Sequence, residues 1–259
     1  MTSINNSVSS FYAFYSLYKH FYPEKPEVTF KQINDTASLY NLDNSFKPTS
    51  KTSLFITWNI KAIAPINHHT SSDSDSDSSA DEEGYKLRGC IGTFAKLPLS
   101  SGVKKYSLIS ALHDSRFPPI KSNELVNLKV TCNILHTFKT IYDKKNSGGD
   151  IFDWEIGKHG IELVFEYNGI QCSATFLPDV MVEQHWDKEQ TFKYLILKGS
   201  NETNLMSIIY KNWKKYFVQV IRYEGTKSTC GYDEFLCTYE KIVTENKDAK
   251  NDSNKKIAM

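Results

Sequence analysis

The sequence predicts a fold of the α+β or mixed α/β class. Segments with the apolar spacing of strands alternate with segments of helical spacing, and no regular strand–helix–strand repeat runs through the chain. The chain has 259 residues, among them 15 Phe, 15 Tyr and 4 Trp, which is enough apolar material for a sizeable core. Its length suits one large domain or two small ones.

The first expected element is a helix at residues 9–22. Five aromatic residues recur there at the spacing of one helix face: Phe11, Phe14, Tyr15, Tyr18 and Tyr22. Ser9 or Ser10 would cap the helix, and Pro23 would end it. An aromatic face of this kind either packs into a core or binds a surface or a partner, and the core is the more common case. Residues 1–8 are expected to be flexible.

An acidic insertion is expected after the first strand. Residues 51–65 predict that strand, since they are rich in β-branched and aromatic side chains and stop at Pro65. Residues 67–83 then contain six acidic side chains and no core-forming residue, so we expect a disordered segment between two strands. Its serines alternate with aspartates, and phosphorylation there would add further negative charge.

From residue 85 the apolar pattern is dense, and each run predicts one element. We expect a strand at 86–94 that leads into a loop, a helix at 104–117 broken by prolines, and a capped turn at Ser122 followed by a strand. The next elements are a hairpin turning at Asn168–Gly169, a helix from Asp187 that Gly199 ends, and a strand at 216–225. The tail at 244–259 has few apolar residues and is expected to be disordered.

Charge and cysteine content exclude several classes of protein. The 31 basic and 30 acidic residues leave a formal net charge of +1, which argues against nucleic acid as the main partner but leaves room for a local basic patch. The five cysteines include no CxxC pair, so we predict neither a disulfide framework nor a metal site. No GxGxxG, P-loop or HExxH motif identifies a cofactor. Without a recognisable signal peptide or membrane span, we expect a cytoplasmic protein with access to the nucleus.

Cys90 is the first candidate for chemistry. It lies in the stretch KLRGCIGTF, beside Arg88 and between Gly89 and Gly92. A positive charge near a thiol lowers the thiol pKa, and glycines leave room for backbone N–H groups to hold an oxyanion or a substrate. The alternative is an inert thiol packed in a strand, which is the usual state of a free cysteine.

Two further clusters contain charged side chains. Asp114 and Arg116 lie where the helix expected at 104–117 gives way to a proline-fixed loop, a common place for functional residues, although a simple charge pair would also suit it. His159 stands among glycines in DWEIGKHGIELVF and is the best candidate for a general base, unless it only caps backbone groups. The candidate catalytic residues are therefore Cys90, His159 and Asp114. The candidate substrate-binding residues are Arg88, Gly89, Gly92 and Arg116.

These blocks resemble the AMMECR domain family. The matching stretches follow one another along the chain: LRGCIGTF, SALHDSRFPPI, WEIGKHGIELVF, SATFLPDV, QHWDKEQT, LILKGS and IRYEGTKSTCGYDEF. The resemblance covers residues 9–65 and 85–240, and the family's RGC hallmark matches at Arg88, Gly89 and Cys90. It implies a single compact α+β domain at 9–243, formed by two intertwined subdomains around a barrel-like mixed sheet.

The resemblance implies a soluble protein of cytoplasm and nucleus, and it implies no particular reaction. In prokaryotes such domains occur beside, or fused to, Memo-type and radical-SAM proteins, so it also suggests a partner from a pathway of that kind. Our leading hypothesis is an enzyme or an enzyme-associated subunit with a cleft around Cys90 and Arg88. The alternative is a protein-binding or regulatory module that uses the same residues.

Overall fold

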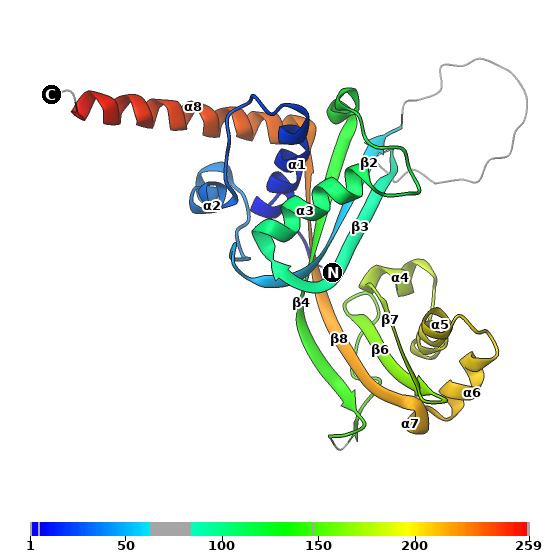
Figure 1. Ribbon diagram of the computed structural model, residues 1–259. Helices are drawn as coiled ribbons and strands as arrows, with labels where there is room; N and C mark the ends of the chain where they lie inside the picture. The colour runs from blue at the N-terminus through cyan, green and yellow to red at the C-terminus, as the bar shows by residue number, and fades with distance from the viewer. Residues whose placement is uncertain (1, 5, 63–83, 147, 258–259) are drawn as a thin grey trace, which may run out of the picture. The chain divides into compact units, whose positions relative to one another are not determined.

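The computed structural model describes residues 2–4, 6–62, 84–146 and 148–257 (Figure 1). It confirms the α+β class, since 40% of the chain is helical and 34% is strand. The acidic insertion expected at 67–83 lies outside the described residues, so its disorder stays a prediction. No helix in the described part of the chain is both long and apolar enough to cross a membrane.

The chain divides into two compact units, and neither is continuous in sequence. The larger unit comprises Ile4–Asn133 and Lys227–Met259, and the smaller one comprises Met1–Ser3 and Ile134–Thr226. The chain passes from one unit to the other within two long strands. These are β4 (Leu128–Asp143) and β8 (Phe217–Gly231). The short β1 (Thr2–Ile4) pairs with β8.

The larger unit combines two strands of its own with most of the long helices (Figure 1). Its elements are α1 (Val8–Phe21), α2 (Phe30–Asp35), η1 (Ala37–Tyr40), β2 (Lys51–Lys61), β3 (Tyr85–Pro98), α3 (Leu99–Leu112), η2 (Ser122–Asn127) and α8 (Tyr232–Ile257). Strands β2 and β3 pair antiparallel, and the register shifts at two places. Helix α3 begins and ends about five residues earlier than expected: its N-cap is Pro98 and its C-cap is His113.

The aromatic face predicted for the first helix is a core face. Phe11, Phe14, Tyr15 and Tyr18 are buried, and the ring of Phe14 stacks on Phe235 of α8 with 4.9 Å between the centroids. Aromatic pairs of this geometry add stability beyond the area they bury.

The start of α1 differs from the prediction. Its N-cap is Ser7, not Ser9 or Ser10, because Ser7 and Ser10 form a reciprocal capping box. The Ser7 hydroxyl also lies 2.7 Å from the hydroxyl of Ser228 on β8. Asn6, Ser7 and Val8 are buried, so the segment expected to be flexible is packed from Asn6 onward.

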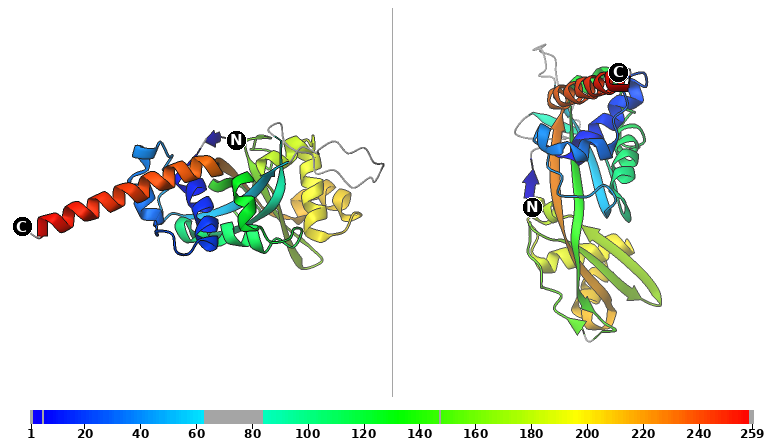
Figure 2. Two further views of the ribbon diagram at one scale, coloured as in Figure 1. Left: turned by 90° about the horizontal axis from the view of Figure 1, so that it is seen from above. Right: turned by 90° about the vertical axis from the view of Figure 1, so that its left-hand side faces the viewer.

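The end of the chain also differs from the prediction. Helix α8 continues to Ile257, where a disordered tail was expected from residue 244 (Figure 2). No proline or glycine follows Gly231, so the two strongest helix breakers are absent from this segment.

The smaller unit packs four helices against a β-hairpin. Its elements are β5 (Gly148–Gly149), β6 (Gly160–Tyr167), β7 (Ile170–Phe176), α4 (Pro178–Glu183), α5 (Lys188–Ser200), α6 (Leu205–Lys211) and α7 (Trp213–Tyr216). The hairpin turn predicted at Asn168–Gly169 is confirmed: both residues have positive φ, 51° and 79°, as a two-residue type I′ turn requires. Its core includes the fully buried Leu163, Phe165 and Phe192.

Hydrogen bonds join the main strands in the order β3-β2-β4-β8-β6-β7. Strand β3, which contains the KLRGCIGTF stretch, is therefore an edge strand with β2 as its neighbour on one side. The backbone groups on its other side need partners from elsewhere.

Candidate functional site

The backbone of Cys90 is held from the outer edge of β3 by two side chains. The Cys90 N–H donates to Asp114 Oδ2 at 2.8 Å, and Arg116 Nη2 donates to the Cys90 carbonyl at 3.0 Å. At Cys90, Asp114 and Arg116 therefore supply the hydrogen-bond partners that a neighbouring strand would otherwise provide. Cys90 pairs with Thr57 of β2 in the sheet, but both backbone groups of Cys90 point away from β2. The two residues therefore form a non-hydrogen-bonded pair, in which the side chains lie close together.

Asp114 is the centre of this arrangement. Its carboxylate is 4% exposed, and it accepts hydrogen bonds from the Arg116 backbone N–H at 3.2 Å, from Arg116 Nε at 3.0 Å and from Arg116 Nη2 at 2.7 Å. These bonds hold the pKa of the Asp114 carboxyl well below its usual range, although burial acts in the opposite direction. The Arg116 side chain is 55% exposed, so its guanidinium faces solvent while Asp114 fixes its orientation.

The thiol of Cys90 is half-buried and its pKa is raised. Burial is the main cause; the Thr57 hydroxyl, 2.9 Å from the sulfur, and the charge of Arg116 act in the lowering direction. The sequence suggested that Arg88 would lower this pKa. The structure differs, because Arg88 contributes nothing to the shift and the resting thiol is neutral.

Arg88 braces the site from another direction. Trp58 pairs with Gly89 and Asn59 with Leu87, so Arg88 is the extra residue of a β-bulge. The bulge directs its guanidinium to Glu124, with Nε at 2.8 Å and Nη2 at 3.2 Å from the two carboxylate oxygens. Arg88 Nη1 also donates to the Pro118 carbonyl at 2.7 Å. Arg88 therefore ties β3 to the segment that follows Asp114.

The two glycines of the stretch serve close packing. A Cβ on Gly89 would lie 2.2 Å from the carbonyl oxygen of Ser110, so α3 can approach β3 only because this residue has no side chain. A Cβ on Gly92 would lie 2.2 Å from the ring of Phe55. Their proposed use in holding an oxyanion stays a prediction.

His159 belongs to the smaller unit, and its contacts there are those of a structural histidine. The ring is buried, Nδ1 accepts the Glu155 backbone N–H at 3.0 Å, and Nε2 lies 3.8 Å from Glu224 Oε1. Burial lowers the pKa of His159, and the charge of Arg222 lowers it further. This geometry matches the capping alternative, and its role as a general base stays a prediction.

The structure therefore brings together Cys90, Asp114 and Arg116, and it braces them through Gly89 and Arg88. Sequence reasoning missed Thr57 and Glu124, the direct partners of Cys90 and Arg88. No motif marks Thr57, but strand pairing could have found it once the register of β2 and β3 was known. The described residues contain no group of three His, Cys, Asp or Glu side chains arranged to hold a metal ion.

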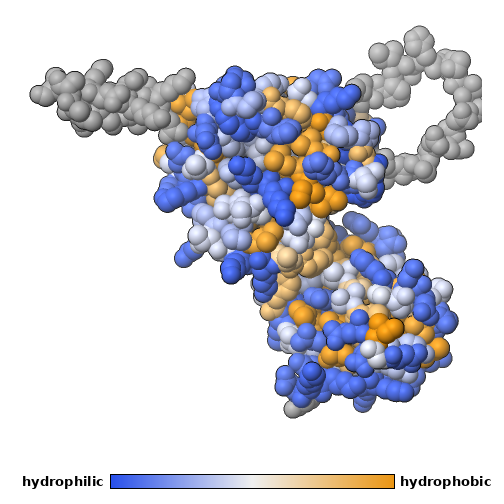
Figure 3. All heavy atoms as spheres, in the orientation of Figure 1, coloured by the Kyte–Doolittle hydropathy of each residue, from blue (hydrophilic) through white to orange (hydrophobic). Residues whose placement is uncertain are grey.

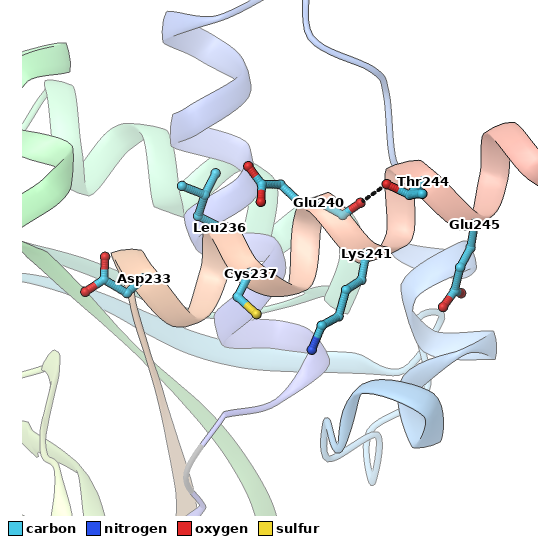
Figure 4. Close-up of a pocket in the computed structure, with 7 residues that line it drawn as sticks. All are labelled: Asp233, Leu236, Cys237, Glu240, Lys241, Thr244 and Glu245. Carbon is cyan, nitrogen blue, oxygen red and sulfur yellow. Dashed lines mark hydrogen bonds between the residues drawn. The ribbon is translucent and has the colours of Figure 1, made fainter.

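A separate groove of about 570 Å³ runs along α8 (Figure 4). Its lining residues all come from this one helix: Asp233, Leu236, Cys237, Glu240, Lys241, Thr244 and Glu245. Cys237 is exposed there, in contrast to the half-buried Cys90. The groove is a shallow helix surface, and the exposed thiol makes Cys237 a useful internal reference for the reactivity of Cys90.

Comparison with known proteins identifies relatives over most of the chain. The family model AMMECR1 matches residues 12–228. An uncharacterized protein of Saccharomyces cerevisiae is 51% identical over 233 residues, which cover 89% of this chain and 88% of the relative. An uncharacterized protein of Kluyveromyces lactis is 44% identical over 240 residues, covering 91% and 95%.

A solved structure has the same fold. The crystal structure of an uncharacterized protein from Pyrococcus horikoshii superimposes with a TM-score of 0.52 and 20% sequence identity, covering 86% of this chain and 89% of that one. At this identity the likeness concerns the fold alone.

Proposed function

The chain belongs to the AMMECR1 family, and from that premise we propose that it acts as an enzyme-associated subunit which binds an anionic ligand at Arg116, beside the neutral thiol of Cys90. One observation carries the proposal: the buried Asp114 carboxylate orients a guanidinium that stays more than half exposed. A fixed, solvent-facing guanidinium is well suited to recognise a carboxylate or a phosphate.

The raised pKa of the Cys90 thiol supports one of the two forms of the leading hypothesis, the enzyme-associated subunit, over the enzyme itself. A catalytic cysteine reacts as the thiolate, and burial opposes thiolate formation at Cys90. We therefore favour a binding role for the resting protein. The contacts with Thr57 and Arg116 favour the enzyme form as second candidate, because both lower the thiol pKa and a ligand that strengthened them would activate the sulfur.

Ligand-observed NMR with a panel of small carboxylates and phosphates tests the binding role. We expect hits on the full-length wild-type chain that are lost in Arg116→Gln. Arg222→Gln is the matched control, because Arg222 also pairs with an aspartate, Asp153, at 2.8 Å in the other unit. A panel without hits, or equal loss in both variants, would show that Arg116 is not an anion site.

Alkylation of the native protein tests the thiol. With iodoacetamide and mass spectrometry, we expect Cys90 to react more slowly than the exposed Cys237 at every pH from about 6 to 9, because burial raises its pKa. Faster reaction of Cys90 than Cys237 below pH of about 7.5 would favour the enzyme form and contradict the neutral resting thiol.

The alternative of a protein-binding module rests on the position of β3. An edge strand can pair with an extended peptide, and β3 stands at the end of the strand order. A peptide bound there would slow amide hydrogen exchange along residues 91–94.

A further inference from the structure

A basic segment of the smaller unit is used by none of the functions considered so far. Between Thr203 and Tyr223 the chain contains four basic residues and no acidic one: Lys211, Lys214, Lys215 and Arg222. Three of the four fall within five positions, at the end of α6 and in α7. In Figure 3 the end of this unit that carries α7 shows mainly hydrophilic residues.

These lysines surround a concave site that contains an aromatic ring. A cavity of about 340 Å³ is lined by Lys211, Asn212, Trp213, Lys214 and Lys215. That volume lies at the lower end of the range for small-molecule sites. Asn212 is held in place, since its side-chain amide donates to the Ile208 carbonyl at 3.0 Å.

Trp213 is held by packing against two aromatic rings of the same unit. The ring of Tyr142 meets the indole edge-on at a centroid distance of 5.3 Å, and the ring of Phe217 lies at 6.0 Å. The Lys214 ammonium lies over the indole at 5.8 Å. The site thus offers a partly buried aromatic surface bordered by positive charge.

The charges are not neutralised by neighbouring carboxylates. Among the described residues, no ion pair involves Lys211, Lys214 or Lys215. Lys144 adds a fourth ammonium nearby, because its Nζ donates to the Lys215 carbonyl at 2.6 Å. The acidic residue next to Lys144 in sequence, Asp143, uses its carboxylate to cap its own turn through the Lys145 N–H at 2.9 Å.

From this combination we infer that the cavity binds a nucleotide, with the base stacked on Trp213 and the phosphates held by Lys211, Lys214 and Lys215. Stacking on an aromatic side chain together with lysine contacts to phosphate is how proteins hold nucleotides without reading their sequence. A free nucleoside phosphate and a single-stranded nucleic acid present the same chemistry. The near-zero net charge of the chain does not oppose this, because the positive charge is local.

The chain contains its own matched control for the test. The sequence Lys-Lys-Tyr occurs at 214–216 and again at 104–106 in α3 of the larger unit. In both copies the lysines are exposed, and in both a lysine ammonium lies over the tyrosine ring, at 5.0 Å for Lys215 and 5.9 Å for Lys105. Only the copy in α7 adjoins Trp213.

The experiment measures binding of fluorescein-labelled ten-nucleotide oligouridylate and of ATP to the full-length chain at 50 mM and 200 mM salt. We expect saturable binding that weakens at least tenfold in the Lys214→Gln/Lys215→Gln variant and is unchanged in Lys104→Gln/Lys105→Gln. With three phosphate contacts, the slope of log K against log salt should be about −2 for oligouridylate, falling to about −0.7 in the first variant. Competition by ATP would identify a free nucleotide as the ligand, and binding of oligouridylate alone would identify a single strand; both support the inference.

Three results would overturn it. The first is no saturable binding of either probe at 50 mM salt, including the case in which only anionic phosphatidylserine vesicles bind. The second is equal weakening in the two double variants, which would indicate a general charge effect. The third combines two findings: inorganic tripolyphosphate binds as tightly as ATP, and Trp213→Leu leaves the affinities for oligouridylate and ATP unchanged. The indole ring would then contribute nothing to binding. Thermal unfolding verifies that the Trp213→Leu variant is folded.

Discussion

Replacing Asp114 with alanine is expected to lower the free energy of unfolding by about 2 to 3 kcal/mol. The Asp114 carboxylate accepts the Cys90 N–H at 2.8 Å, and removing it leaves that backbone donor without a partner, at a cost of about 1–3 kcal/mol. The ion pair with Arg116 adds only about 0–1 kcal/mol, because the guanidinium is exposed and can turn to water.

The assay is guanidinium-induced unfolding followed by tryptophan fluorescence, with Asp35→Ala as the control. Asp35 forms an exposed pair with Lys31 one helix turn away, so its removal is expected to cost less than about 1 kcal/mol. A loss below about 1 kcal/mol in Asp114→Ala, or equal losses in the two variants, would refute the view that Asp114 holds the edge of β3.

The pH dependence gives a second, independent readout of the same contact. The folded pKa of Asp114 lies below the value of about 3.9 in the unfolded chain, so its contribution to stability is fully present above pH of about 4 and is lost as the pH falls toward the folded pKa. In Asp114→Asn this part of the acid-induced loss should be absent. An unchanged profile between pH of about 2 and 4 would contradict the assigned pKa shift.

Three shorter predictions follow from neighbouring contacts. Gly89→Ala should lower the thermal unfolding temperature by several degrees, because the added methyl group meets a backbone carbonyl of α3, whereas Gly231→Ala has open space and should change it little. A double-mutant cycle of Arg88→Gln and Glu124→Gln, measured by chemical unfolding, should give a coupling energy of about 1–2 kcal/mol, since both side chains are mostly buried; a value near zero would contradict the brace. NMR titration should give His159 a pKa below 6.5, so this residue contributes stability that is present above pH of about 6.5 and is lost below it; a titration at or above 6.5 would contradict its burial.

Local patterns were sufficient to predict some of the regular elements, whereas the short helices α2, α4, α6 and α7 and the long helix α8 were not predicted. The aromatic spacing in α1 and the Asn168–Gly169 turn depend on neighbouring residues alone, and both predictions are confirmed. Element ends were harder, because they depend on contacts that spacing does not encode. At the start of α1, the N-cap Ser7 forms its capping box with Ser10 and also contacts the hydroxyl of Ser228, 221 positions away in the chain.

The candidate site shows the same division. Asp114 and Arg116 were predicted as functional residues, with a simple charge pair as the alternative; they do form an ion pair, and both also bind the backbone of Cys90. The influence of Arg88 on the thiol was inferred from their separation by two positions. The β-bulge at Arg88 sends the guanidinium to Glu124, and a bulge is not visible in spacing.

Several residues of the KLRGCIGTF stretch are explained by one structural role: they join β3 to the segment that follows α3. Gly89 is required where α3 touches the strand, Arg88 is required where Glu124 approaches, and the backbone of Cys90, not its sulfur, receives Asp114 and Arg116. The contacts with Asp114 and Arg116 use only the backbone N–H and carbonyl of residue 90, which every residue except proline provides, so they do not explain the thiol. The sulfur is therefore the one feature of the stretch that is left for ligand binding or chemistry, and its reactivity relative to Cys237 is the measurement that separates these two roles.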